Sequence, residues 1–442
     1  MDTTTASTPT DSAQLSVADL AAQTRSDRNR AVDCYRAIAM IVVALGHWAA
    51  IAAFVDDGEL VAGNALEYAP SMAWVTWALQ VMPLFFVVGG YASAVSLDSF
   101  TAKGRGTNAD WVAGRLRRML APTVVLAGFW AALFAMGAVA GVTGLIGMAA
   151  AAAAIPLWFL ANYTIDTGIA PIVRPRYRAH PVATALMLVG TFTAVQIAHL
   201  AGVPHIGHVN WVVGWLMFQV AGFAWRDGHL PTGRRLVAVA AGAWTTLIAM
   251  TVFGPFPVSM IHIPGMELSP THPPSVALVV FGIAHSATAL AAAPAITRFL
   301  ERNTKAWAAV VAANSMAMTI YHWHMTAAIG AVAIVWQVGL LPTASIGTAA
   351  WWVQKLPILG LSTLFLAVIV AAVSGVERRS LLAPARSWVG GWPSMTLAVI
   401  AVSSLLKLWT AGSGSAAMVG SIAVFVVGRM VLSAPAREEV GR

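Results

Sequence analysis

The stretch WVQKLPILGLSTLFLAVIVAAVSG, residues 352–375, is apolar apart from a few polar side chains, and Arg378 and Arg379 follow it closely. A run of about 20 apolar residues is long enough for a helix to cross the hydrocarbon core of a bilayer. A helix also satisfies its own backbone polar groups, for which lipid offers no other partner. The stretch therefore predicts a membrane-spanning helix that ends in a basic loop.

Similar apolar runs recur along the chain. The other candidate spans, which bring the set to twelve, fall near 37–55, 71–97, 119–141, 156–173, 181–200, 209–225, 236–254, 275–293, 313–336, 393–410 and 416–434. Of the 442 residues, 58% are hydrophobic and only 10% are charged, so lipid must cover much of the surface. Strand-like alternation is absent, which favours helices over a β-barrel. We predict an all-α integral membrane protein, a polytopic helical bundle.

The basic residues determine the predicted orientation of these spans. If residues 119–173 hold two spans, all but three of the 26 Lys and Arg residues fall on one side of the membrane. The exceptions are Lys355, Lys407 and Arg429. Under the positive-inside rule the basic side is cytoplasmic, and both termini are then cytoplasmic as well. This asymmetry accounts for the formal net charge of +8, so we expect no nucleic-acid partner.

The chain divides into four segments. Residues 1–30 are rich in Ser, Thr, Ala and Asp and predict a disordered cytoplasmic tail. Residues 31–388 hold ten of the spans, residues 389–434 hold an additional transmembrane helix pair, and residues 435–442 form a second cytoplasmic tail. Arginine outnumbers lysine and alanine is abundant, which fits a GC-rich bacterial source and a place in the bacterial inner (plasma) membrane.

The first helix carries the clearest chemical pattern. Arg36 and His47 are separated by ten residues, which puts them on one helix face, about 16 Å apart along the axis. Arg36 is expected at the cytoplasmic mouth with Asp33 on the same side, and His47 near mid-membrane. A histidine that faces lipid is costly, so His47 should face the bundle interior or a wet cavity. A helix–helix hydrogen bond for His47 and an interfacial anchor for Arg36 remain open as alternatives.

Other polar residues in or near the spans are weaker candidates. Tyr321 and His324 are three apart and share a helix face, so His324 is either a second polar group of a site or a packing residue. Asp166 lies midway along the fourth span, where a carboxylate is costly, and it either serves a site or bonds a neighbouring helix. His205 and His208 have metal-like spacing, but no acid or cysteine accompanies them, so we expect no metal site.

Five short motifs occur in a fixed order along the chain. They are Arg30-Ala-Val-Asp33-x-x-Arg36 leading to Gly46-His47, Met82-Pro-Leu-Phe-Phe-Val-Val-Gly89-Gly90-Tyr91, Arg115-Leu-Arg-Arg118 ending at Pro122, Pro156-Leu157-Trp158, and Tyr321-His-Trp-His324. Their order over about residues 28 to 380 resembles the acyltransferase-3 family of integral membrane O-acyltransferases, whose opening motif is an arginine, ten residues and a histidine. The family usually has Ser-Gly-Phe where this chain has Gly89-Gly90-Tyr91.

The resemblance implies that residues 31–388 form a ten-helix acyltransferase domain. Such a domain takes an acyl group, here an acetyl or other short acyl group, from cytoplasmic acyl-CoA to a hydroxyl of an extracytoplasmic glycan or glycolipid. The family's functional histidine maps onto His47 and its paired arginine onto Arg36. Neutral imidazole suits proton removal from a hydroxyl near pH 7.

The resemblance also implies a donor site at the cytoplasmic mouth. Arginine is well suited to clamping the phosphates of CoA, so Arg36, Arg115 and Arg118 are the predicted donor-binding residues. The residues that would support the site are Asp33, Asp166, Tyr321 and His324. We expect acyl-CoA as a co-substrate, a carbohydrate or glycolipid acceptor, and no permanently bound cofactor.

Two other classes of function fit a chain of this composition. A non-catalytic exporter of an envelope lipid or glycan also has about twelve helices, but such carriers often show two related halves. The second half of this chain holds no echo of the Arg-x₁₀-His pattern. A structural subunit of an envelope assembly complex would need none of the polar intramembrane residues. The sequence therefore favours an enzyme.

Overall fold

The computed structural model describes residues 24, 28–266, 268–382, 388, 390–412 and 415–433. Most of the predicted N-terminal tail and the whole predicted C-terminal tail lie outside these residues. Within the described part of the chain, helices predominate and the strands form one two-stranded sheet. The prediction of an all-α polytopic fold is confirmed.

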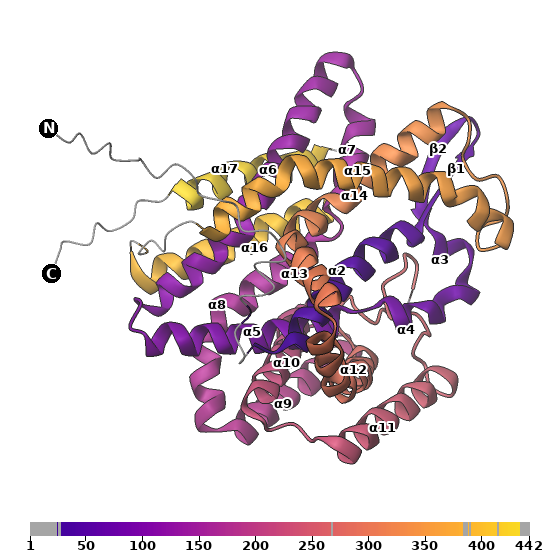
Figure 1. Cartoon of the computed structure of the whole chain (residues 1–442). Helices are drawn as coiled ribbons and strands as arrows, with labels where there is room; N and C mark the ends of the chain where they lie inside the picture. Colours follow the sequence, from indigo (N-terminus) through magenta and orange to yellow (C-terminus); the bar gives the residue numbers. More distant parts are fainter. Residues whose placement is uncertain are drawn as a thin grey trace, which may run out of the picture.

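The helices form one bundle, with the small sheet at one edge (Figure 1). In chain order the elements are α2 (Arg30–Ala50), β1 (Ile51–Asp56), β2 (Glu59–Asn64), α3 (Ala65–Tyr68), η1 (Pro70–Val75), α4 (Thr76–Leu79), α5 (Met82–Ala102), α6 (Asn108–Ala140), α7 (Thr143–Ala154), α8 (Leu157–Ala179), α9 (Pro181–Leu200), α10 (His208–Asp227), α11 (Gly233–Val252), α12 (Val276–Arg302), α13 (Thr304–Ser315), α14 (Ala317–Gln337), α15 (Ala349–Leu382), α16 (Gly391–Ala411) and α17 (Ser415–Ser433).

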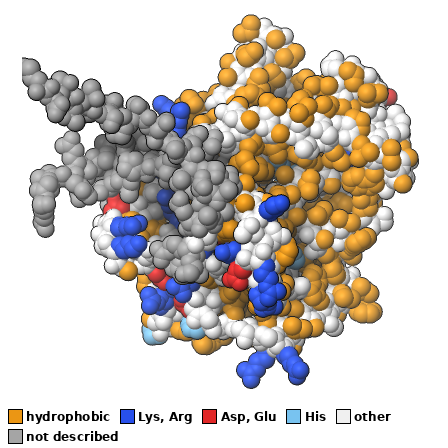
Figure 2. Space-filling model, in the orientation of Figure 1, with side chains coloured by type: hydrophobic (Ala, Val, Ile, Leu, Met, Phe, Trp, Pro, Cys, Tyr) orange, Lys and Arg blue, Asp and Glu red, His pale blue; other side chains and the backbone are white. Residues whose placement is uncertain are grey.

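The described helices include nine candidate spans that are long and apolar enough to cross a membrane. The pair α7 and α8, bent by 45° at a short break, makes a tenth candidate. The other two predicted spans correspond to α10 and α17, which are not among these candidates. In Figure 2 hydrophobic side chains cover much of the right part of the surface and hardly any charged side chain appears there, whereas Lys and Arg gather towards the left and the bottom of the view. The protein is a multi-pass membrane protein.

The first helix starts and ends earlier than the predicted span 37–55. It ends at Ala50, and residues 51–56 pair antiparallel with residues 59–64 instead of continuing the helix. The two residues of the connecting turn, Asp57 and Gly58, have φ angles of 46° and 85°. Tight hairpin turns require positive φ at both central residues, and Asp-Gly is among the pairs that adopt it most readily. The local turn chemistry therefore overrides the apolar run.

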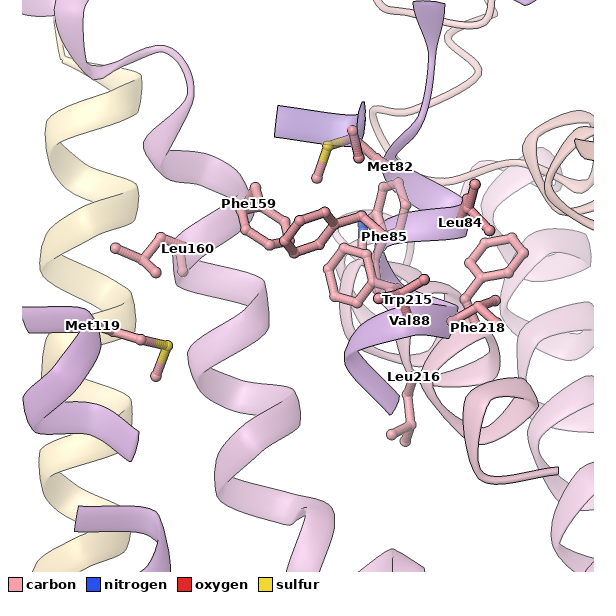
Figure 3. Packing of buried hydrophobic residues seen from close by; sticks show 14 of the residues in the cluster. Met82, Leu84, Phe85, Val88, Met119, Phe159, Leu160, Trp215, Leu216 and Phe218 are labelled. Carbon is pink, nitrogen blue, oxygen red and sulfur yellow. The ribbon is translucent and has the colours of Figure 1, made fainter. Parts of the chain in front are cut away.

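Aromatic side chains from three helices fill the centre of the bundle (Figure 3). Phe85 and Phe86 of α5 meet Phe159 of α8 edge to face, with ring centroids 4.9 and 5.3 Å apart. Trp215 of α10 stacks on Phe86 at 4.8 Å. Edge-to-face and stacked pairs add to the stability that burial of the rings provides. This cluster fixes α5, α8 and α10 relative to one another.

Two glycines allow α5 and α10 to lie in close contact. A Cβ on Gly90 would lie 2.0 Å from the carbonyl oxygen of Gln219, and a Cβ on Gly222 would lie 2.1 Å from that of Val87. Small residues let helices approach closely within a bilayer, where packing contacts drive association. Any larger residue at position 90 or 222 would push the two helices apart.

A buried ion cluster ties the opposite ends of the same three helices together. The guanidinium of Arg174 on α8 bonds Asp98 of α5 and Asp227 of α10, with its shortest N–O distance to each carboxylate 2.6 Å. Four hydrogen bonds connect the three side chains, and the side chain of Arg174 is only 2% exposed. A buried cation is tolerated when carboxylates pair with it and use its donors, and here both do.

The two helices at the C-terminal end pack directly on the rest of the bundle. Val399 of α16 lies against Gly168 of α8, where a Cβ would be 3.0 Å from the valine side chain. Phe425 of α17 contacts Gly128 of α6 in the same way. Figure 1 shows this pair alongside α6 and α8. The pair therefore shares a packed interface with the predicted ten-helix domain.

We predict from the charge asymmetry that the β1–β2 turn and the 253–275 loop face away from the cytoplasm. Single cysteines at Glu59 and Met266, on a Cys34→Ala background, should react with a membrane-impermeant thiol reagent on intact cells. A cysteine at the exposed Lys103 should react only after the cells are opened. Labelling of the Lys103 position but not of Glu59 in intact cells would reverse the orientation.

Candidate functional site

The structure brings two histidines from distant parts of the chain together. His47 lies near the end of α2 and His324 lies in α14, and Nε2 of His324 is 3.2 Å from Nδ1 of His47. The ring centroids are 5.1 Å apart. His324 is fully buried and His47 is half-buried. His47 therefore faces the bundle interior, as the sequence predicts, and His324 is its neighbour.

The backbone carbonyls around this pair fix which nitrogens carry protons. Nδ1 of His324 lies 2.8 Å from the carbonyl of Tyr321, and Nδ1 of His47 lies 2.9 Å from that of Val43. A carbonyl can only accept, so both Nδ1 atoms must donate. The single Nδ1–H of His47 is then shared between the Val43 carbonyl and Nε2 of His324, and both accept from it. Nε2 of His47 has no hydrogen-bond partner among the described residues, and in this tautomer it carries a lone pair.

Two further contacts hold the end of α2 in place. The indole N–H of Trp48 donates to the carbonyl of His324 at 2.8 Å, which joins the two histidine helices beside the pair. The ammonium of Lys355 on α15 donates to the carbonyls of Ala49 and Ile51 at 2.8 and 2.5 Å. A cation at a helix C-terminus favours the helix because the last carbonyls lack partners there. Sequence reasoning assigned Lys355 to the non-cytoplasmic side, at the start of the span 352–375, and gave it no role.

Lys355 is held by aromatic rings as well as by carbonyls. Its ammonium lies 4.2 Å from the ring centroid of Trp351 and 5.3 Å from that of Trp352. The residue is 1% exposed and no carboxylate pairs with it in the part of the chain that the structure describes. Its charge is therefore stabilised by the end of α2 and by ring faces.

We predict that Lys355→Met lowers the rate of acyl transfer by about tenfold to a hundredfold, because an error of about 1 Å in a reacting group can cost that much. The apparent KM for the donor should stay unchanged. Lys355→Arg, which keeps the charge and the donors, should restore most of the rate, and Lys103→Met is a matched exposed control. Full activity of Lys355→Met would show that the contact of Lys355 with the end of α2 does not position His47.

Arg36 lies on α2 as well, eleven positions before His47. Its Nε donates to Oδ1 of Asn314 on α13 at 2.7 Å. The amide nitrogen of Asn314 in turn donates to the backbone carbonyl of Asp33 at 2.8 Å. The Asp33 carboxylate pairs with Arg28 at 2.6 Å and not with Arg36. Asn314 therefore orients the Arg36 guanidinium, and the sequence offered no signal for this partner.

The other two predicted donor-binding arginines lie one turn apart on α6, and Arg115 is the one that lies near Arg36. Arg115 and Arg118 both interact electrostatically with Tyr163 of α8, and Arg36 and Arg118 both act on Arg115. Arg115 stacks on Trp111 at 4.8 Å and donates to the carbonyl of Ala92 at 3.3 Å. No carboxylate pairs with either residue among the described residues. The three arginines therefore form a cationic cluster that is not neutralised by the chain.

Tyr163 explains one departure from the family motif. A Cβ on Gly89 already lies 2.9 Å from the ring of Tyr163. A serine at this position would add a hydroxyl beyond that Cβ and force the ring to move. The glycine therefore makes room for a tyrosine that reaches the arginine cluster, a role that the sequence alone did not reveal.

Two of the predicted supporting residues lie outside the histidine pair. The Tyr321 hydroxyl donates to the carbonyl of Pro156 at 2.5 Å, which ties α14 to the start of α8. Both carboxylate oxygens of Asp166 are buried and have no partner among the described residues. Only the backbone carbonyl of Asp166 accepts a hydrogen bond from a side chain in the described part of the chain, from the amide of Gln219 at 3.4 Å. Asp166 therefore does not orient either histidine.

The comparison with known families is decisive at this point. The family model described as an acyltransferase domain, that of the acyltransferase-3 family, matches residues 29–376. The chain belongs to the acyltransferase-3 family. No curated protein and no solved structure matches it. The matched range contains both site histidines and the three arginines, and it ends before α16.

Membership of the acyltransferase-3 family supports a membrane acyltransferase. An acyltransferase needs a group that takes up the proton of the attacking nucleophile and a binding site for the acyl donor. The His47–His324 pair and the Arg36, Arg115 and Arg118 cluster offer these two elements. His47 lies near the end of α2 and Arg36 near its beginning, whereas Arg115 and Arg118 lie near the beginning of α6.

Proposed function

We propose that this protein transfers an acetyl or other short acyl group from cytoplasmic acyl-CoA to a hydroxyl of an extracytoplasmic glycan or glycolipid. The observation that carries the proposal is the His47–His324 pair, which leaves Nε2 of His47 without a hydrogen-bond partner among the described residues. The setting is the bacterial inner membrane, with both termini in the cytoplasm. His47 is the general base in this account, and His324 accepts the hydrogen bond that fixes its tautomer.

The proposed reaction needs no group beyond the two substrates. The acceptor hydroxyl attacks the thioester carbonyl while Nε2 of His47 takes the hydroxyl proton. A carbon–oxygen bond forms, the carbon–sulfur bond breaks, and the CoA thiolate leaves. The thiolate then takes the proton from the imidazolium, which returns His47 to its neutral form. The products are an O-acyl ester and CoA, and no electrons are gained or lost overall.

The arginine cluster supports the choice of CoA as donor. CoA carries several negative charges, and guanidinium groups bind phosphates through paired, charge-assisted hydrogen bonds. Arg36 is already held by Asn314, whereas Nε of Arg115 has no hydrogen-bond partner among the described residues. The cluster also lies at the end of the bundle that the charge pattern assigns to the cytoplasm, where acyl-CoA is found.

We predict that the double variant Arg115→Ala, Arg118→Ala raises the apparent KM for acyl-CoA more than it lowers kcat. Each lost charge-assisted contact weakens ground-state binding by roughly 1.5–3 kcal/mol. A matched control is Arg234→Ala with Arg235→Ala, because both of these arginines are exposed at the start of α11. Steady-state kinetics with varied acyl-CoA measure the effect. An unchanged KM in the folded double variant would mean that these two arginines only orient the protein in the membrane.

A further inference from the structure

A cavity of about 670 Å³ opens beyond the histidine pair, on the side that the charge pattern places outside the cell. Its walls come from β1, α3, the end of α14, the 338–348 loop and the start of α15. Figure 1 shows the sheet, the end of α14 and the start of α15 gathered at the same edge of the bundle. We propose that this cavity is an acceptor subsite that binds an uncharged sugar ring of a glycan, an inference that rests on the proposed function.

The position of the cavity follows from the two histidine helices. α2 runs from His47 directly into β1, which carries Phe54, and α14 runs from His324 to Trp336. Twelve residues of helix separate His324 from Trp336, a rise of about 18 Å. A sugar bound in this cavity would therefore lie some distance from the hydroxyl that reacts at His47. The cavity is thus suited to a remote part of an extended acceptor.

The lining fits a sugar ring. Four aromatic residues, Phe54, Tyr68, Trp336 and Trp351, contribute to the walls. Aromatic faces contact the apolar faces of sugar rings, and their polar edges can hydrogen-bond. The Trp351 ring is held in place by its contacts with the Lys355 ammonium and with the ring of Trp352. The lining includes no Asp, Glu, Lys or Arg, so the cavity suits an uncharged ligand.

Unused polar groups favour a sugar over a lipid chain. The lining residues include Tyr68, Ser345 and Trp336. The two hydroxyls and the indole N–H of these residues have no hydrogen-bond partner in the described part of the chain. A hydrocarbon chain could not bond any of them, whereas sugar hydroxyls can donate to or accept from all three. The ligand class that uses both the rings and these polar groups is therefore a neutral saccharide.

The test is binding of the purified full-length protein to an immobilised panel of neutral and acidic oligosaccharides, without acyl-CoA. The wild type should retain neutral saccharides, and Tyr68→Ala with Trp336→Ala should weaken that binding by about tenfold or more. The matched control is Trp74→Ala with Phe253→Ala, which removes two exposed aromatic rings elsewhere. His47→Gln should bind the panel like the wild type, because binding needs no proton transfer.

Three outcomes would overturn the subsite. They are no retention of neutral saccharides by the wild type, retention that the Tyr68 and Trp336 variant leaves unchanged, and a co-purified lipid that native mass spectrometry finds in the wild type and not in that variant. Failure of the proposed function looks different. In that case the panel binding behaves as expected, but the protein transfers no acyl group from acyl-CoA.

Discussion

His47→Gln should lower the rate of acyl transfer by about 10²–10⁴-fold, the contribution that a general base typically makes. Glutamine keeps the size and can still donate to the Val43 carbonyl and towards His324. It offers no nitrogen that takes up a proton near neutral pH. The measurement is the initial rate of ester formation at saturating acyl-CoA, with insertion and a single elution peak as evidence of folding.

The controls separate a base from a packing residue. Binding of acyl-CoA to His47→Gln should match the wild type, because the arginine cluster lies near the other end of α2. His324→Gln should lose less activity than His47→Gln, since His324 acts only through the hydrogen bond to Nδ1 of His47. The exposed His208 serves as the neutral control. Near-native transfer by His47→Gln would mean that the histidine only bridges α2 and α14.

Arg174→Ala should lower the free energy of unfolding by about 3–5 kcal/mol, because it leaves two partly buried carboxylates close together without a cation. Arg174→Lys should fall between the alanine variant and the wild type, since an ammonium cannot reproduce the forked hydrogen bonds to Asp98 and Asp227. Denaturation in detergent, followed by tryptophan fluorescence, measures the change. Arg176→Ala, two positions along at an exposed site, should change it by less than about 0.5 kcal/mol.

A compensating variant makes the stability prediction specific. Replacing Arg174 with Met together with Asp98→Asn and Asp227→Asn removes all three charges at once. Such replacement of a whole buried ion cluster is often neutral or even stabilising. The triple variant should therefore be more stable than Arg174→Ala. If Arg174→Ala unfolds like the wild type, the ion cluster does not hold α5, α8 and α10 together.

The sequence predicts most of the helices because each helix that crosses lipid must carry its own apolar run. Apolar runs and basic loops are local features, and they locate α9, α11 and α16 closely. The hairpin after Ala50 was missed although Asp57-Gly58 is a strong local turn signal. The segment between the predicted spans 119–141 and 156–173 holds a further helix, α7, which ends at Ala154 before α8 starts at Leu157.

The candidate site was only partly predictable, and the reason is the distance along the chain between its parts. The shared face of Arg36 and His47 follows from helix geometry alone. The contact of His47 with His324 depends on how α2 packs on α14, across 277 positions, and no local pattern encodes that packing. The same is true of Asn314 beside Arg36 and of Lys355 at the end of α2.

The most direct test of the central claim is acyl transfer by the purified protein reconstituted in lipid vesicles. The assay supplies acetyl-CoA labelled in the acetyl group, together with a glycan and glycolipid extract of bacterial envelopes, and follows both free CoA thiol and labelled, alkali-sensitive ester. We predict that the wild type forms ester and CoA in equal amounts and that His47→Gln forms almost none. No ester above protein-free vesicles, or equal ester from His47→Gln, would contradict a His47-based acyltransferase.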